Sequence, residues 1–387
     1  MWDRLKRLFG KQPPAAAALD PHLPPAAQKD LPDCPWLPAD QNPWAIPVID
    51  VRPITLTMLS TSTNALYAQN AISFATDDGR SFINHDPPNA IESPADLHFR
   101  RDRLLAPGAL FLPDCMEHKW ALFFHENRIL CVRSWTRTVA LSAAVEQHDD
   151  RIHITSIRRD SSSVNDPPRF AERLLDFLLR SHALQTPFPA PLPQGMAETP
   201  SAAGLWCMST FGKLALVAAE AEPPMPLPEK PLRTHSLLHI AVARKDIPAI
   251  HAQLAAGIPI DIRDPDGLSP LHWACADDST AMLEELLRCG CPIDVHSDQG
   301  ATPLMQAVQA RHPAQVTFLL EHGADPNAGD SRGFTALHRS AEMGELDITK
   351  TLLAHGANPA PEAEGNTPLS LAQARNEAAI IALLTTP

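Results

Sequence analysis

The last 155 residues of the chain repeat a short motif at intervals of about 33 residues. The four clearest copies span residues 269–274, 302–307, 335–340 and 367–372, and a degenerate copy lies at 236–241. A glycine stands two residues before each clear copy: Gly267, Gly300, Gly333 and Gly365. A regular period of this length is typical of repeat architectures, in which each unit packs only against its neighbours.

Each copy carries residues suited to begin and end a pair of helices. A Thr or Ser at its start can cap a helix, and the Pro that follows in most copies suits the first helical turn. A second, Leu-rich segment ends at a glycine, which tolerates the left-handed conformation. These glycines are Gly257, Gly290, Gly323 and Gly356. Because one pair cannot bury its own apolar face, the sequence predicts an all-α solenoid of about five repeats over residues 233–387.

With its Thr-Pro-Leu-His-x-Ala pattern, this segment resembles the ankyrin repeat. The resemblance implies that His239, His272 and His338, at the fourth motif position, form structural hydrogen bonds between neighbouring repeats. Met305 and Ser370 replace this His in two copies, where the bonding must differ. The resemblance also implies a concave face, made of loop fingers and the exposed side of the first helices, that binds another protein.

Position within the repeat selects the residues expected on that concave face. Trp273 is the most informative, because Trp is the commonest anchor of protein interfaces and the position need not be large. The alternative is that Trp273 packs against the N-terminal domain or the linker. The remaining candidate partner-binding residues are Asp277, Gln306, Gln309, Arg339, Glu342 and Met343 on the first helices, and Asp264, Asp266 and Arg332 on the fingers.

The net negative charge of the chain limits the kinds of partner it is expected to bind. The net charge is −13, and residues 233–387 hold 10 Lys and Arg against 19 Asp and Glu, which leaves −9 on the repeats and −4 elsewhere. Nucleic acid is therefore not expected as a ligand, because phosphate binding needs clustered Lys and Arg. The charge favours a basic protein partner or serves only for solubility.

Cysteine usage and hydropathy predict a soluble cytoplasmic protein. The seven cysteines are odd in number and scattered, which is typical of a reducing compartment. No run of 18 apolar residues and no secretion signal is present. The 24 Arg against 8 Lys weakly indicate a bacterial, GC-rich genome.

Residues 1–11 form a basic amphipathic segment, and residues 12–47 are a linker rich in Pro and Ala. Contact of residues 1–11 with an anionic membrane ranks below a frayed terminus or a helix docked on a partner, because three turns are marginal alone. Residues 221–232 form a second Pro-rich linker before the repeats.

Residues 48–220 are predicted to form an α+β domain. Strands are expected at 48–51 and 54–59, and an antiparallel meander at 120–124, 128–135, 140–145 and 151–157. A helix is expected over 167–184. This domain resembles no family of known activity.

One cluster in this domain mixes residues of catalytic or metal-binding type: Cys115, His118, His125 and Cys131. Structural zinc would need a second paired Cys or His, and the residue order selects no base for a Cys nucleophile. We therefore assign no catalytic residue, metal ligand or cofactor.

The favoured hypothesis is a non-catalytic adaptor that binds a partner protein on the concave face of its repeats. The first alternative is an enzyme or effector whose catalytic 48–220 domain is targeted by the repeats. The second is a structural part of a membrane-associated assembly held through residues 1–11. A pocket that joined Cys115 or Cys131 with a histidine would favour the enzyme.

Overall fold

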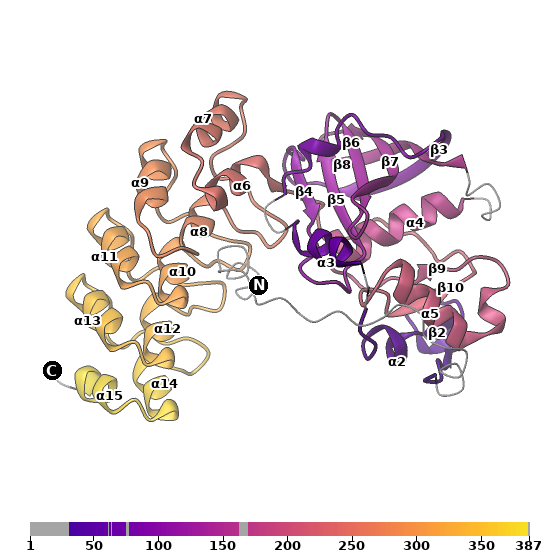
Figure 1. Cartoon of the computed structure of the whole chain (residues 1–387). Helices are drawn as coiled ribbons and strands as arrows, with labels where there is room; N and C mark the ends of the chain where they lie inside the picture. Colours follow the sequence, from indigo (N-terminus) through magenta and orange to yellow (C-terminus); the bar gives the residue numbers. More distant parts are fainter. Residues whose placement is uncertain (1–30, 61, 63, 75–76, 162–168, 386–387) are drawn as a thin grey trace. The chain divides into compact units, whose positions relative to one another are not determined.

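The computed structural model describes residues 31–385 except 61, 63, 75–76 and 162–168 (Figure 1). The chain forms two compact units, which divide between Leu237 and Leu238. The amphipathic segment predicted at 1–11 and the first part of the linker lie outside the described residues. The alternatives for residues 1–11 therefore stay predictions.

The N-terminal unit is built on an antiparallel sheet, which confirms the predicted α+β class. Seven strands of the described residues form this sheet. Their hydrogen-bonded order is β11 (His235–Ser236), β4 (Gly108–Phe111), β5 (Trp120–His125), β6 (Arg128–Arg133), β7 (Thr138–Gln147), β8 (Arg151–Asp160) and β3 (Ala90–Arg100). The predicted meander is confirmed as β5 to β8, whereas β3 and β4 were not predicted.

The two faces of this sheet are covered differently. On one face α4 (Phe170–Leu178), its π-helical continuation η5 (Leu179–Ala183) and α5 (Pro200–Thr210) enclose a core that includes Phe99, Ile154 and Phe177. On the other face, near β4 to β6, Phe82 and Phe123 stack 5.7 Å apart beside α3 (Ala65–Ile72) and η3 (Arg80–Phe82). In β8 and β3 the residues between buried positions are mostly part-exposed or exposed, so this half carries polar side chains.

A second, four-stranded sheet has the order β1 (Trp36–Leu37), β2 (Val48–Asp50), β10 (Val217–Ala219) and β9 (Ala190–Pro191). Residues 36–37 belong to the stretch that the sequence assigns to the linker. The short helices η2 (Ala39–Gln41) and η6 (Met196–Glu198) lie in loops of the same unit.

The strand expected at 54–59 is wrong. Residues Arg52–Thr55 form the short helix α2, with Pro53 in its first turn. The amides of Ile54 and Thr55 donate to the carbonyl of Val51 instead of joining a sheet. Pro fits the start of a helix and cannot donate to a sheet ladder, so this apolar run begins as a helix.

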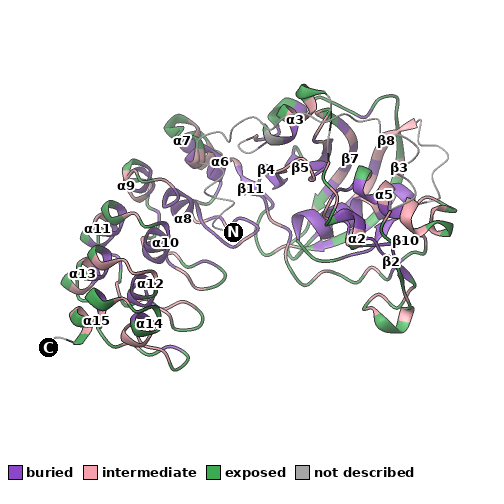
Figure 2. Cartoon of the chain, turned by 60° about the horizontal axis from the view of Figure 1, so that its bottom comes forward, coloured by how far each residue is buried: buried purple, intermediate pink, exposed green. Residues whose placement is uncertain are grey.

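The C-terminal unit is a stack of helix pairs, which confirms the predicted solenoid. The described residues contain five pairs: α6 (Leu237–Arg244) and α7 (Ile247–Ala255), α8 (Pro270–Ala274) and α9 (Ala281–Arg288), α10 (Pro303–Ala310) and α11 (Pro313–Glu321), α12 (Ala336–Met343) and α13 (Leu346–Ala354), α14 (Pro368–Arg375) and α15 (Ala378–Thr385). The first helices form one row and the second helices another (Figure 1). Many buried residues lie where the rows meet, and exposed residues line the outer side of the second row (Figure 2).

Among the described residues, no helix combines the length and the apolar character needed to cross a bilayer.

Candidate interaction surface

Buried histidines join successive repeats, as the ankyrin resemblance implies. The Nε2 atoms of His239, His272 and His338 lie 3.0, 2.8 and 3.3 Å from carbonyl oxygens in the following repeat. The backbone amide of Ser269 donates to His272 Nδ1, which leaves Nε2–H as the donor. Burial lowers the pKa of His272 to about 4, so the ring is neutral near pH 7.

Met305 and Ser370 cannot make this bond in the same way. The Met thioether has no hydrogen-bond donor, and the Ser hydroxyl is too short to reach the next repeat as the imidazole does. The Ser370 hydroxyl instead accepts from the Thr367 amide at 2.9 Å, within its own repeat. The junction after Met305 therefore lacks this polar link, whereas Ser370 lies on α14 of the last described helix pair, after which the described residues contain no further junction.

Trp273 is not an exposed anchor, which corrects the prediction for this residue. Its side chain is buried, with 2% of the residue exposed. The indole Nε1–H donates to Asp264 Oδ2 at 2.9 Å, and the ring lies 5.2 Å from that of His239. Trp273 therefore stabilises the array from within.

Asp264 is also buried, so its assignment to an exposed finger is wrong. Its Oδ1 accepts from the amides of Asp266 and Leu268 at 2.9 and 2.8 Å, which fixes the turn of the finger. A buried carboxylate is stable only when hydrogen-bonded in this way. Asp264 holds the base of the finger to the first helix of its repeat.

The same arrangement recurs two repeats later. Asp330 Oδ1 accepts from the amides of Arg332 and Phe334, and its Oδ2 binds the Arg339 guanidinium at 3.0 Å. In both repeats an Asp is followed nine positions later by a side chain that can donate to it. That nine-residue spacing is the sequence signal for these finger contacts, and it corrects the prediction that these residues are exposed binding positions.

The other predicted positions differ in how accessible they are. Gln306 is buried, with 8% exposed, which corrects its assignment as an outward-facing residue. Glu342 and Arg332 are exposed but form ion pairs with Arg375 and Glu364 of the next repeat. Five predicted residues are part-exposed: Asp266, Asp277, Gln309, Arg339 and Met343.

Among the part-exposed candidates on the first helices, Gln309 and Met343 have no side-chain hydrogen bond or ion pair in the described residues. Asp277 is in an ion pair with Lys245, and Arg339 is bound to Asp330. Gln309 lies on α10 and Met343 on α12, two neighbouring helices of the first row. Both are part-exposed, and the described residues provide no side-chain hydrogen bond to Gln309.

Gln315 is a structural residue that was not predicted from the sequence. It is fully buried, and its Nε2 lies 3.1, 2.6 and 2.7 Å from the carbonyl oxygens of Ala274, Asp277 and Ser279 in the preceding repeat. A polar residue in the second helix of a repeat carries no periodic signal, so the contact becomes visible only when the repeats stack.

Cys115 and His118 come together in the N-terminal unit, with ligand atoms within 4.8 Å, whereas Cys131 does not join this group. Cys131 is fully buried in β6, and burial raises its pKa. Cys115 lies near Asp114 and His118, whose Oδ1 and Nδ1 are 2.9 Å apart, but burial raises the pKa of Cys115 as well. A Cys nucleophile requires the opposite shift, because the thiolate is the reactive form.

A cavity of about 360 Å³ in the same unit holds a different polar pair. Lys119 Nζ lies 2.6 Å from Ser60 Oγ and 3.7 Å from the centre of the Trp135 ring. Burial lowers the pKa of Lys119 to about 8. The lining includes neither Cys115 nor any histidine.

Comparison with protein families agrees with the stacked helix pairs. A family described as ankyrin repeats (3 copies) matches residues 238–330, and one described as ankyrin repeats (many copies) matches residues 319–372. The comparison with curated proteins found no match. Proteins with ankyrin repeats generally bind other proteins. Residues 238–372 of this chain are therefore ankyrin repeats, and their general role is protein–protein interaction.

Proposed function

We propose that this protein is a non-catalytic adaptor that binds a partner protein on the first-helix row of its ankyrin repeats. The supporting observation is the pair Gln309 and Met343, part-exposed on the neighbouring helices α10 and α12. Met adapts to irregular apolar surfaces, and an amide both donates and accepts hydrogen bonds. Glu342, next to Met343 in the sequence, adds a carboxylate that is paired with Arg375.

A basic partner fits the net charge of −9 on residues 233–387. Several of these acidic groups are already paired between repeats, such as Asp298 with Arg263 and Glu364 with Arg332. These pairs reduce the charge available to a partner. Electrostatic attraction should therefore affect the rate of association more than the final affinity.

The test is capture of partners from a cell extract by the full chain, followed by affinity measurements on the partner obtained. The double variant Gln309→Ala/Met343→Ala should weaken binding by tenfold or more, an effect of about 1.4 kcal/mol or larger. Lys350→Ala, an exposed residue of α13 in the second row, is the matched control. Loss of binding with Lys350→Ala alone would place the interface on the outer row instead.

A second candidate, a catalytic 48–220 domain, is supported by the Ser60–Lys119 pair. A Lys with a lowered pKa can act as the base for a Ser nucleophile. Labelling of the full chain by a fluorophosphonate, compared with Ser60→Ala, tests this function. Equal labelling of the two proteins would reject Ser60 as a nucleophile.

A further inference from the structure

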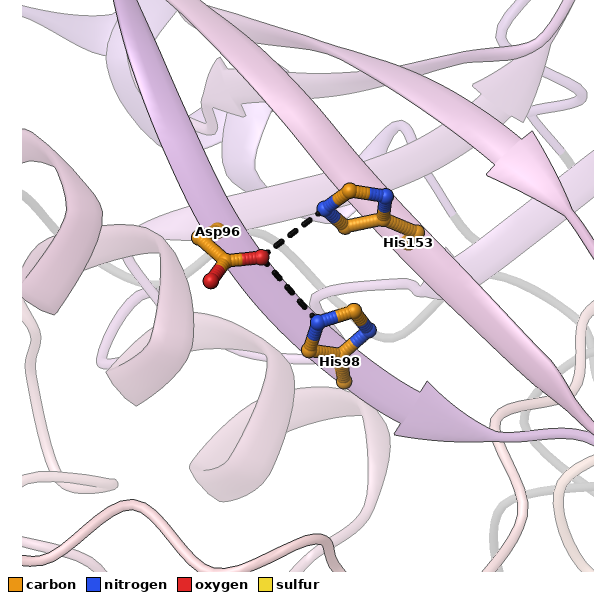
Figure 3. Close-up of side chains that lie close together, drawn as sticks. All are labelled: Asp96, His98 and His153. Atoms are coloured by element: carbon orange, nitrogen blue, oxygen red, sulfur yellow. Dashed lines mark hydrogen bonds and ion pairs between the residues drawn. The ribbon is translucent and has the colours of Figure 1, made fainter.

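The side chains of Asp96, His98 and His153 lie together on the exposed half of the large sheet, although His153 is far from the other two in the sequence. His98 Nε2 and His153 Nε2 lie 3.0 and 2.9 Å from the same atom, Asp96 Oδ1 (Figure 3). The two imidazole rings stack with centroids 4.4 Å apart. These contacts place two nitrogen donors and one carboxylate oxygen around a single point.

The strand register explains this convergence. His98 of β3 is directly opposite His153 of β8, so both side chains leave the same face of the sheet. The register shifts between Pro94 and Leu97, and Asp96 lies in this irregularity. A bulge redirects a side chain from the face that strict alternation would give it, and here Asp96 points at both imidazoles.

We propose that Asp96, His98 and His153 bind a divalent transition-metal ion of the zinc class. Imidazole with carboxylate is a ligand set that suits Zn²⁺, Ni²⁺ and Cu²⁺. In a tetrahedral site with bonds of about 2.0–2.1 Å, neighbouring ligand atoms lie about 3.3 Å apart. The distances from Asp96 Oδ1 to the two histidine nitrogens, 3.0 and 2.9 Å, need to lengthen by only a few tenths of an ångström, and all three ligand atoms already lie within 4.8 Å of one another.

The surroundings favour binding at this cluster. The side chains of His98 and His153 are 40% and 26% exposed, so an ion can reach them from solvent. Within the described part of the chain, Asp96 forms ion pairs only with these two histidines. His153 also belongs to a second group of possible ligands with Glu146, its cross-strand neighbour, and His148. Water can complete the coordination.

Two other groups of possible ligands are less suited to an ion. At His251, Glu285 and Cys289, the Arg288 guanidinium binds Glu285 at 2.6 Å and lies 3.3 Å from His251 Nε2. A cation therefore already occupies that cluster. Asp114, Cys115 and His118 are less accessible, and His118 packs edge-on against Phe111.

Metal binding would tie the edge strand β3 to β8. Strand β3 is the last in the hydrogen-bonded order, so one of its sides has no strand partner among the described residues. An ion held by residues of both strands binds only the folded sheet, and it therefore stabilises the N-terminal unit by mass action. The stability of the N-terminal unit should therefore increase with the concentration of free metal ion.

The test is titration of the full, chelator-treated chain with Zn²⁺ by calorimetry. The chain has 17 His and 7 Cys, which can also bind Zn²⁺ elsewhere. The informative quantity is therefore the difference in bound Zn²⁺ between the natural chain and each variant, not the total Zn²⁺ bound. We expect His98→Ala/His153→Ala to lose one equivalent of bound Zn²⁺ relative to the natural sequence. The control His85→Ala, an exposed histidine of the same unit, should keep it. The same number of equivalents and the same affinity in the double variant would overturn the proposal.

A second variant and a spectroscopic readout separate ligation from folding. Asp96→Asn preserves the size of the side chain and removes the charged ligand, and it should weaken Zn²⁺ binding by roughly tenfold or more. Electron paramagnetic resonance with one equivalent of Cu²⁺ should show coupling to two imidazole nitrogens. That coupling should disappear in the double histidine variant, and its persistence there would also refute the site.

Discussion

Replacing Trp273 tests whether this residue supports the fold or binds a partner. In Trp273→Phe the indole N–H is lost and with it the 2.9 Å hydrogen bond to Asp264 Oδ2, while most of the apolar ring remains. A hydrogen bond to a charged group contributes about 1.5–3 kcal/mol, so the free energy of unfolding should fall by that amount. Trp273→Ala should cost about 3–5 kcal/mol, because a nearly fully buried ring is replaced by a cavity.

The assay is urea unfolding of the full chain followed by far-ultraviolet circular dichroism, to which the helical repeats contribute most. A double-mutant cycle with Asp264→Asn isolates the pair, and we expect the two substitutions to be strongly non-additive. Gln309→Ala, on the same row but without a side-chain hydrogen bond in the described residues, should change stability by only about 0.5 kcal/mol. If Trp273→Phe unfolded like the natural protein but lost its partner, the assignment of Trp273 to the interior would be wrong.

Three further predictions concern the stability of the repeats, measured by the same unfolding assay. Leu304→Ala should destabilise by about 2–5 kcal/mol, since Leu304 is 1% exposed, and a cost like that of Gln309→Ala would contradict the burial of Leu304 in the core of the repeats. Gly300→Ala should lower stability more than Gly323→Ala. Both glycines have positive φ, which costs an alanine about 1–2 kcal/mol. A Cβ at Gly300 would also lie 2.6 Å from the backbone nitrogen of Ser331, whereas Gly323 faces open space. As pH falls from 6.5 towards 4, His272 binds a proton in the unfolded chain but stays neutral in the folded protein. His272 should therefore lower the free energy of unfolding by up to about 3 kcal/mol in that window. Parallel curves of stability against pH for the natural protein and His272→Gln in this range would contradict this prediction.

The sequence by itself determined the repeat architecture. The 33-residue period, the capping residues and the terminating glycines each act within one or two turns of chain, so they specify helix pairs without knowledge of the tertiary fold. The apolar face that each pair leaves open then requires stacking. The meander β5 to β8 was predictable for the same reason, because short apolar strands alternate with tight polar turns.

Tertiary structure decided which repeat residues face inward. Trp273 and Asp264 occupy variable positions, and only their mutual contact shows that both are buried. Gln315 likewise acquires its role from three carbonyl groups of the preceding repeat. Position in a repeat predicts the row on which a residue lies, but the size and hydrogen bonding of its neighbours determine whether a partner can reach it.

The same distinction applies to the N-terminal unit. The residues that form the proposed metal site lie on β3 and β8, which are separated by 50 residues of chain. Their convergence depends on the pairing register of those two strands and on the irregularity at Asp96. Register is set by the burial of one face of the sheet, which is a property of the whole domain. Local sequence pattern therefore determined the helices, the caps and the meander, whereas long-range pairing alone brought Asp96, His98 and His153 together.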